Sequence, residues 1–277
     1  MKTNKETYSK EFLSRVPKSD LHVHLDGSLR LSTLIELAKE RKVKLPSYTE
    51  SGMRKLVFKE RYRNLREYLY GFMFTTAVMQ DPEAMERVSY EFAWDNINEG
   101  VCYVEVRFAP QLHINSRQSM KDVLVAVNRG LKAAQLEYNT RPEVQSDKTP
   151  RFEYGIITSA MRKFEPSYSE YYQDFFSIHQ YSRPREIYPL ASLELARAAV
   201  KLRDKEGLPI VGFDLAGEEA GFPGEHHWEA FAYAQKHFLK KTVHAGEAFG
   251  PESIYQAITD LQAARVGHGY YLFSVGA

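Results

Sequence analysis

Six short runs rich in β-branched and aromatic residues recur along the chain, and a stretch with helical spacing of its apolar residues follows each of the first five. The runs are apolar almost throughout, which is typical of strands buried on both faces of a parallel sheet. Alternation of such strands with helices predicts a parallel sheet covered by helices. The predicted strands cover 21–25, 101–110, 152–160, 209–217, 241–247 and 265–269, and the predicted helices cover 31–42, 65–74, 82–99, 118–137, 190–205, 228–238 and 251–264.

Two folds show this alternation, the doubly wound sheet and the β/α barrel. Polar side chains stand at the C-terminal ends of strands one, two, four, five and six, where barrel enzymes place their active sites. A doubly wound sheet would gather them at one switch point, and the sequence has no glycine-rich phosphate loop. We therefore predict an α/β fold, a TIM-type (β/α) barrel, forming a single domain over residues 1–277 with a surface loop at 139–150.

The charge balance and the cysteine count exclude several classes of partner and site. The chain has 37 lysine and arginine residues against 36 aspartate and glutamate residues, so no basic excess indicates nucleic acid or an anionic membrane. A small-molecule partner is the expectation. Cys102 is the only cysteine, which excludes a disulfide within the chain and a thiolate-rich metal site. No apolar stretch suits a secretory signal or a membrane span, and we expect a cytoplasmic protein.

Two histidines stand two positions apart in the first predicted strand. Because side chains alternate across a strand, His22 and His24 point to the same side, which in a barrel can be the interior. Two unpaired imidazoles are costly to bury, and neutral imidazole is a good ligand for zinc. The pattern therefore indicates a metal site. The alternative is a pair of core histidines satisfied by local hydrogen bonds.

Two further motifs bring polar side chains to the same predicted barrel mouth. HAGE at 244–247 ends the fifth strand, so His244 can reach the mouth while Glu247 faces a ligand. The alternative for Glu247 is a carboxylate in the first turn of the next helix, stabilised by the helix dipole. GHG at 267–269 lets the backbone pack closely while His268 projects into the mouth, the alternative being a turn histidine. No role is assigned to the other five histidines. We expect a loop that enters a helix at His226 and His227, and surface or supporting positions for His113, His179 and His237.

Five motifs together resemble those of the adenosine deaminase family of metal-dependent hydrolases. They are LHVHLDGSLR, YVEVRFAP, DLAGEE, HAGE and RVGHG, and they occur in the family's order between residues 20 and 269. The resemblance implies a β/α barrel that holds one zinc ion. It also implies a reaction of purine salvage, in which the 6-amino group of adenosine or 2′-deoxyadenosine is hydrolysed to give the inosine product and ammonia.

Carried onto this sequence, the resemblance makes His22, His24 and His244 zinc ligands. It implies that Glu247 protonates the purine ring at N1, and that His268 orients the zinc-bound water and helps to deprotonate it. Water attacks an aromatic carbon poorly, so a metal-activated nucleophile and a protonated ring are both needed. The carboxyl group that donates this proton needs a raised pKa, which a dry pocket provides.

The resemblance also assigns contacts to the substrate. His24 lies beside the substrate, the backbone N–H of Gly217 meets purine N3, and Asp26 accepts a hydrogen bond from the ribose 5′-hydroxyl. Because the Asp26 carboxylate would repel a 5′-phosphate, it favours the nucleoside over AMP. Arg107 and Arg162, at the ends of strands two and three, are expected to brace the barrel without touching substrate.

The aromatic helix predicted at 65–74 has two interpretations of equal weight. Tyr68, Leu69 and Phe72 could form an apolar lid over the purine. The same residues could be an apolar stripe that faces the core.

The C-terminal end of the sequence departs from the family pattern. Family members continue through two more strand–helix units, and the last strand supplies an Asp-Asp pair, one a zinc ligand and the other holding the attacking water. The sequence ends at YYLFSVGA (270–277). We therefore expect a barrel truncated after about six of its eight units, with exposed sheet edges and little activity from the 277 residues alone.

Two alternative functions stay open. One is a deaminase of the same family that acts on adenine or on a modified adenine nucleotide, against which Asp26 argues. The other is a truncated nucleoside-binding remnant that binds purines without turnover. Binuclear relatives use a carboxylated lysine on strand four, and VGFDLAG has no lysine there, so one metal ion is expected. The oligomeric state does not follow from the sequence.

Overall fold

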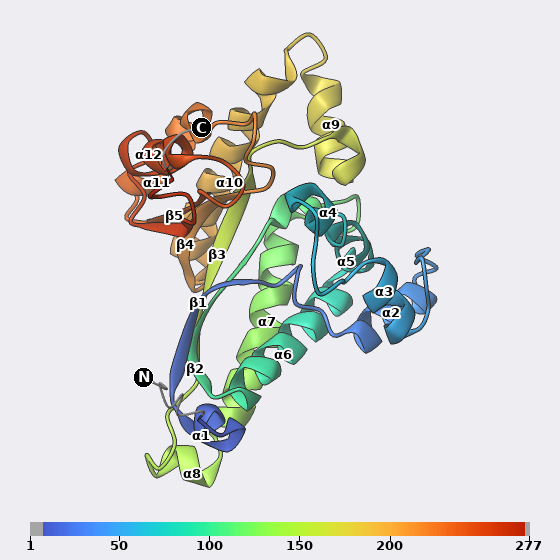
Figure 1. Ribbon diagram of the computed structural model, residues 1–277, viewed down its shortest axis with the longest axis vertical. Helices are drawn as coiled ribbons and strands as arrows, with labels where there is room; N and C mark the ends of the chain where they lie inside the picture. The colour runs from blue at the N-terminus through green and yellow to red at the C-terminus, as the bar shows by residue number, and fades with distance from the viewer. Residues whose placement is uncertain (1–7, 275–277) are drawn as a thin grey trace, which may run out of the picture.

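The computed structural model describes residues 8–274. Residues 1–7 and 275–277 lie outside the described residues. They include the start of the N-terminal stretch that lacks a secretory signal pattern and the last three residues of YYLFSVGA. Six strands form one parallel sheet in the order β1-β2-β3-β4-β5-β6 (Figure 1). They are β1 (Lys18–His24), β2 (Val101–Phe108), β3 (Glu153–Met161), β4 (Ile210–Ala216), β5 (Lys240–Ala245) and β6 (Arg265–His268).

Helices connect these strands and cover them. They are α1 (Lys10–Arg15), α2 (Leu31–Glu40), α3 (Glu50–Leu56), α4 (Leu65–Leu69), α5 (Phe72–Val78), α6 (Pro82–Asn98), α7 (Met120–Asn139), α8 (Pro142–Gln145), α9 (Glu170–Ile178), α10 (Pro184–Glu206), α11 (Trp228–Lys236) and α12 (Pro251–Thr259), with short 3-10 turns η1 (Pro110–Leu112), η2 (Pro166–Tyr168) and η3 (Gly224–His227). The pair α6 and α7 packs beside β2, while α10, α11 and α12 cover the later strands. Within residues 8–274, no helix is both long and apolar enough to cross a membrane.

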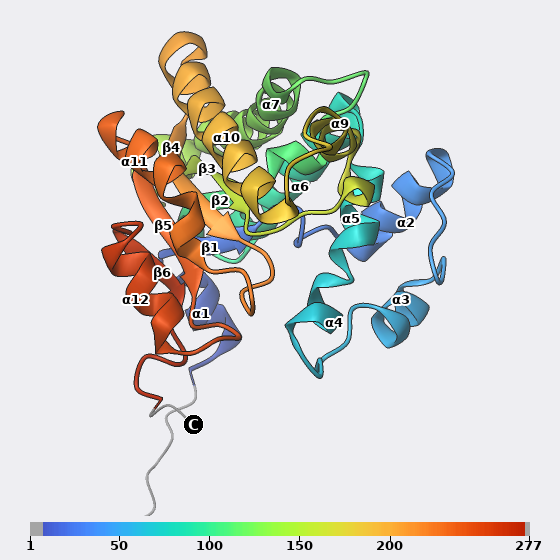
Figure 2. The ribbon, with the colours of Figure 1, turned by 90° about the horizontal axis from the view of Figure 1, so that it is seen from above.

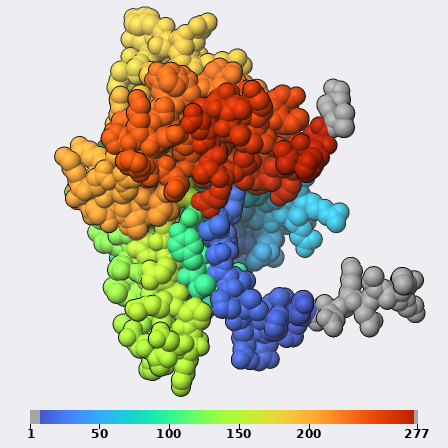
Figure 3. All heavy atoms as spheres, turned by 90° about the vertical axis from the view of Figure 1, so that its left-hand side faces the viewer, coloured from blue at the N-terminus to red at the C-terminus, as the bar shows by residue number. Residues whose placement is uncertain are grey.

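The sheet curves so that its first and last strands approach each other. Gly267 of β6 lies directly against the His22 ring of β1, and the ring centroids of His22 and His268 lie 4.7 Å apart. Arg265 of β6 also forms an ion pair with Glu105 of β2, a strand that is not its neighbour in the sheet. Figure 3 shows the C-terminal elements lying against β1. This curvature, the sequential strand order and the alternation with helices confirm the predicted TIM-type barrel over six strands.

The hydrophobic core lies between the sheet and its helices. Val104, Ile156 and Phe213, one from each of three neighbouring strands, are fully buried, as are Leu124 and Leu195 of the covering helices. Full burial of one such side chain contributes about 1.5–3 kcal/mol, so this layer fixes the framework from which the strand ends project. Seen from above, α2 to α5 stand on the opposite side of those strand ends from β6 and α12 (Figure 2).

Several element boundaries differ from the prediction. The single helix predicted at 65–74 is interrupted at Tyr70–Gly71 and becomes α4 and α5. Helix α10 begins at Pro184 instead of 190, because Pro184 suits a first turn and Arg183 and Glu186 form a capping pair there. The segment before it contains α9, whose aromatic residues pack with Phe164 in a separate apolar cluster, and the predicted loop 139–150 contains α8.

Candidate active site

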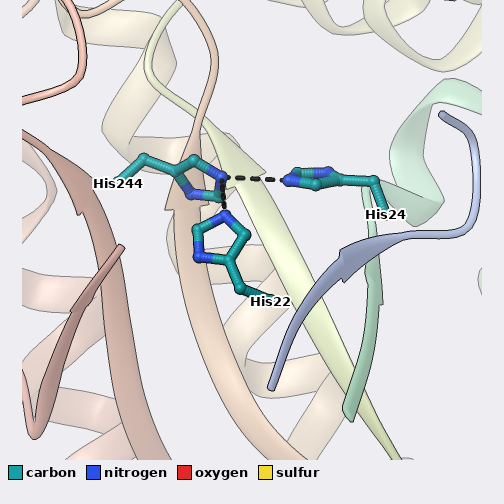
Figure 4. A group of neighbouring side chains, drawn as sticks. All are labelled: His22, His24 and His244. Atoms are coloured by element: carbon teal, nitrogen blue, oxygen red, sulfur yellow. Dashed lines mark hydrogen bonds between the residues drawn. The ribbon is translucent and has the colours of Figure 1, made fainter. Parts of the chain in front are cut away.

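Three imidazole rings meet at the C-terminal ends of β1 and β5. His22 Nε2 lies 3.1 Å from His244 Nε2, and His24 Nε2 lies 3.0 Å from the same atom. One nitrogen from each ring can be chosen so that all three lie within 4.8 Å of one another. Figure 4 shows the rings pointing at a common centre, with His22 and His24 on one strand and His244 facing them. The structure thus brings together the three histidines predicted as metal ligands.

The protonation of these rings suits a metal ion. Burial, followed by the charge of Arg107, lowers the pKa of His22 to about 3, and burial, followed by His244, holds the pKa of His24 well below its ordinary value. Both rings are therefore neutral at neutral pH and can present a lone pair. Imidazole nitrogens that converge on one point form a donor set that divalent transition metals take. The three residues fit a metal site.

A buried carboxylate that the sequence reasoning missed orients His244. Asp214 of β4 is fully buried, and its Oδ2 lies 3.1 Å from His244 Nδ1. The ring proton therefore sits on Nδ1, which leaves Nε2 free to coordinate, as is usual for metal-binding histidines. Burial opposes the charge on Asp214, but His244 and then Arg107 hold its pKa below the ordinary value. An ionisable residue inside the apolar run VGFDLAG was the signal that could have identified it.

Arg107 and Arg162 brace the strands as predicted. Arg107 lies 3.5 Å from Asp214 Oδ2 and donates a 2.7 Å hydrogen bond to the carbonyl oxygen of Leu21. Arg162 donates a 2.7 Å hydrogen bond to the carbonyl oxygen of His244. Both guanidinium groups are buried, and neither lines the cavity described below.

Glu247 and His268 stand next to the three rings. His268 Nε2 lies 3.6 Å from Glu247 Oε2, and the His268 ring centroid is 5.3 Å from that of His244. Burial raises the pKa of the Glu247 carboxyl, and burial, followed by His244, lowers the pKa of His268 to about 4. Helix α12 starts at Pro251, the predicted residue, and Glu247 lies in the turn before it, so the alternative that placed Glu247 in the first turn of this helix is wrong.

The glycines of the GHG motif allow a close approach. A Cβ atom at Gly267 would lie 2.4 Å from His22 Cε1, so only glycine leaves room for that ring. His268 itself has a φ of +72°, a left-handed conformation that a non-glycine residue rarely adopts. Such strained residues persist only where the surrounding structure fixes them, which is common at functional sites.

A cavity of about 270 Å³ opens over the histidines. Gly217 lines it from the end of β4, and Tyr68, Leu69 and Phe72 line it from the opposite side. These three side chains therefore face the cavity, which favours the lid interpretation of this segment over the core stripe. The remaining lining residues come from the first strand, its loop, α4 and the ends of β4 to β6: His22, Val23, His24, Gly27, Ser28, Leu65, Ala216, His244, Glu247 and His268.

Asp26 lies deeper than expected for a residue at the cavity surface. Its side chain is buried, its Oδ1 is 3.9 Å from His24 Nδ1, and its Oδ2 accepts a 3.4 Å hydrogen bond from the Ala109 N–H. Burial raises the pKa of Asp26 to about 7. Within the part of the chain that the structure describes, Oδ1 has no hydrogen-bond partner, so one acceptor stays available beside His24.

Two of the histidines left without a role are buried in the core. His113 is fully buried with Nδ1 3.0 Å from the carbonyl oxygen of Met79, and His227 is buried with Nδ1 2.8 Å from Ser192 Oγ. His113 therefore takes the supporting position, not the surface one, and its Nε2 has no hydrogen-bond partner within residues 8–274. His227 ends η3 directly before α11, in agreement with the expected loop that enters a helix. His226 is exposed, and His179 and His237 are partly exposed.

Comparison with known proteins identifies the family. A model of the family described as adenosine deaminase matches residues 17–168 and 177–274. The chain belongs to the adenosine deaminase family. Adenosine deaminase 1 of Streptomyces coelicolor is 36% identical over 266 residues, covering 95% of this chain and 58% of the relative. The adenosine deaminase of Mycobacterium avium is 36% identical over 263 residues, covering 94% of this chain and 62% of the relative.

Solved structures of deaminases share the fold. The Arabidopsis N6-mAMP deaminase superimposes with a TM-score of 0.67 at 25% identity, over 94% of this chain and 68% of that one. An amidohydrolase from Burkholderia ambifaria with bound Zn superimposes with a TM-score of 0.71 at 18% identity, over 98% of this chain and 64% of that one. This chain therefore spans about 60% of the length of the two bacterial relatives.

Proposed function

We propose that this chain carries the zinc site and the purine pocket of an adenosine deaminase, which hydrolyses adenosine to inosine and ammonia. The observation that carries the proposal is the convergence of His22, His24 and His244 beside Glu247 and His268 at one cavity. Family membership and the 36% identity to two bacterial adenosine deaminases support it.

The three histidines would hold the metal ion through Nε2. Three imidazole ligands suit zinc, and the bound Zn of the structurally similar amidohydrolase supports this choice. Zinc, when bound, lowers the pKa of its water and so supplies a nucleophile at neutral pH. No lysine stands in β4, which supports a single ion.

Glu247 and His268 divide the proton transfers between them. The raised pKa of Glu247 favours the protonated carboxyl group, which can deliver its proton to purine N1 and make C6 a better electrophile. The lowered pKa of His268 leaves its ring neutral and able to accept a proton from the attacking water. His268 Nε2 and Glu247 Oε2 lie 3.6 Å apart. Their opposite pKa shifts, caused by the surroundings of each group, would make Glu247 the acid and His268 the base.

Four further contacts would position the nucleoside. Gly217 lines the cavity, where its backbone N–H would donate to purine N3, and the ring of His24 would lie beside the substrate. The free Oδ1 of Asp26 would accept from the ribose 5′-hydroxyl. The apolar side chains of Tyr68, Leu69 and Phe72 would cover the purine.

A second candidate is the deamination of a modified adenine nucleotide. The likeness to the N6-mAMP deaminase at 25% identity favours it. Asp26 argues against it, because a 5′-phosphate would meet a buried acidic group. A purine-binding protein without turnover is the third outcome.

Substrate assays on the zinc-loaded 277-residue protein test the proposal. Ammonia release should be measured with adenosine, 2′-deoxyadenosine, adenine, AMP and N6-methyl-AMP, with His244→Ala as the background. We expect little ammonia from the 277 residues, and the release that does occur from adenosine should depend on His244 and exceed release from AMP. Preference for N6-methyl-AMP would select the second candidate, and purine binding without any ammonia would select the third.

A further inference from the structure

One carboxylate outside the proposed reaction centre accepts an unusual set of hydrogen bonds. Glu219 follows β4 in DLAGEE and is buried. Its Oε1 accepts a 2.6 Å hydrogen bond from the Gly246 N–H. Its Oε2 accepts from the N–H groups of Glu247 at 3.0 Å, Ala248 at 2.7 Å and Phe249 at 3.0 Å. Four consecutive backbone donors of the turn after β5 therefore end on one side chain of the turn after β4.

The backbone of this turn is shaped to point its donors at one place. Gly246 has a φ of +66°, and a Cβ atom there would lie 2.6 Å from Ile254 Cδ1. Successive N–H groups in such a turn form a concavity that binds an anion. Here the anion is a side chain of the same chain.

The sheet itself does not hold this turn on the β4 side. Paired residues of β4 and β5 are Gly212 with Lys240 and Phe213 with Lys241, and the pairing ends there. The C-terminal half of β5 pairs with β6, but side chains hold it on the β4 side, since Arg162 donates to the carbonyl oxygen of His244 and Asp214 contacts the His244 ring. Beyond His244, Glu219 links the turn at 246–249 to the β4 side.

We propose that Glu219 is a positioning residue that fixes the Glu247 backbone, and so places the Glu247 carboxyl group relative to His244 and His268. The inference rests on the function proposed above for Glu247. Its neighbour Glu218 has a different task, because its carboxylate pairs with Lys163 and Arg66 on the surface.

The geometry requires a carboxylate of this length. Glutamine keeps the shape but turns one acceptor oxygen into an NH₂ group, which would face a backbone N–H at the distances given above. Charge-assisted hydrogen bonds are roughly twice as strong as neutral ones, so the loss affects all four donors. Aspartate keeps the charge, but its side chain is one methylene group shorter, so the carboxylate would lie farther from the four N–H groups.

Hydrogen exchange tests the anchoring without any need for turnover. In Glu219→Gln, we expect the amides of 246–249 to exchange about tenfold or more faster than in the wild type, with or without zinc. Glu225→Gln is the matched control, since Glu225 is exposed in η3, in the same connection between β4 and α11, and its carboxylate lies 3.9 Å from His226 Nε2, its one ion-pair partner among residues 8–274. Unchanged exchange at 246–249 would overturn the proposal.

Kinetics test whether the anchoring acts through Glu247. In Glu219→Gln, kcat should fall about 10- to 100-fold while KM stays within about threefold and zinc content is unchanged. In a Glu247→Gln background, the same substitution should change kcat less than about twofold. An equal loss in both backgrounds overturns the positioning role.

Failure of this inference can be told apart from failure of the proposed function. A zinc-loaded wild-type protein that releases no ammonia refutes the function for this chain, and hydrogen exchange alone then decides whether Glu219 anchors the turn. If Glu219→Gln does not fold, Glu219→Asp takes its place in both experiments, with the same expected directions and the same refuting results.

Discussion

Replacement of Asp214 by asparagine should weaken metal binding and also lower the stability of the metal-free protein, and the two effects can be measured separately. The carboxylate contacts His244 Nδ1 at 3.1 Å, accepts a hydrogen bond from Ser159 Oγ at 3.0 Å and lies 3.5 Å from Arg107. Asparagine has nearly the same shape but no charge, and it can offer an oxygen to only some of these groups. His244 then loses the partner that fixes its proton on Nδ1.

Two costs of Asp214→Asn can be estimated. Loss of a partner that orients a metal-binding histidine weakens metal binding about 10- to 100-fold, or about 1.4–2.8 kcal/mol. The metal-free protein also loses stability, because the buried Arg107 keeps its bond to the Leu21 carbonyl but loses its counter-charge. Breaking a buried pair by removing one partner costs about 3–5 kcal/mol, and we expect the lower end here.

Zinc competition against a coloured chelator measures the first cost, and urea unfolding of the metal-free protein measures the second. Ser159→Ala is the matched control, because it removes one hydrogen bond to Asp214 and keeps the charge. It should cost about 1 kcal/mol of stability and leave zinc affinity within about threefold. A folded Asp214→Asn protein that binds zinc within about twofold of the wild type would refute the reasoning.

Three other perturbations have defined outcomes. Gly267→Ala should weaken zinc binding at least about tenfold with an unchanged circular dichroism spectrum, because its Cβ would displace the His22 ring; unaltered affinity contradicts this. Zinc at about 100 times its Kd should raise the free energy of unfolding by about 2.7 kcal/mol, and His22→Ala should abolish most of that gain in the same urea titration. Burial lowers the folded-state pKa of His113 from 6.5 to about 4, so the unfolded state takes up the proton first and stability falls as pH drops below about 6.5. Between pH 7.5 and 5, His113 should lower the free energy of unfolding of the wild type by about 2 kcal/mol. Urea unfolding at the two pH values should show this contribution to be absent from His113→Gln.

Local patterns in the sequence were sufficient for the framework and for the metal cluster. The strands were predictable because each is a short, largely apolar run that precedes or follows a stretch with helical spacing, and the convergence of His22 and His24 followed from the two-residue period of a strand. His244 could be added because the C-terminal ends of parallel strands lie at one edge of the barrel. None of these steps needs the distance between two particular side chains.

The remaining contacts depend on distances that the sequence does not contain. Glu218 and Glu219 are identical neighbours in DLAGEE, yet the first lies in a surface ion pair and the second is buried against the turn after β5. Which of them points inward is decided by where the pairing of β4 and β5 ends, at Phe213 and Lys241. Beyond that point the ends of β4 and β5 are no longer paired, so the N–H groups of residues 246–249 have no backbone partner on β4. The Glu219 side chain extends from the β4 side and accepts their hydrogen bonds instead. The same separation explains why Asp214 reaches His244, so the residues that support the site are those that bridge a gap in the sheet.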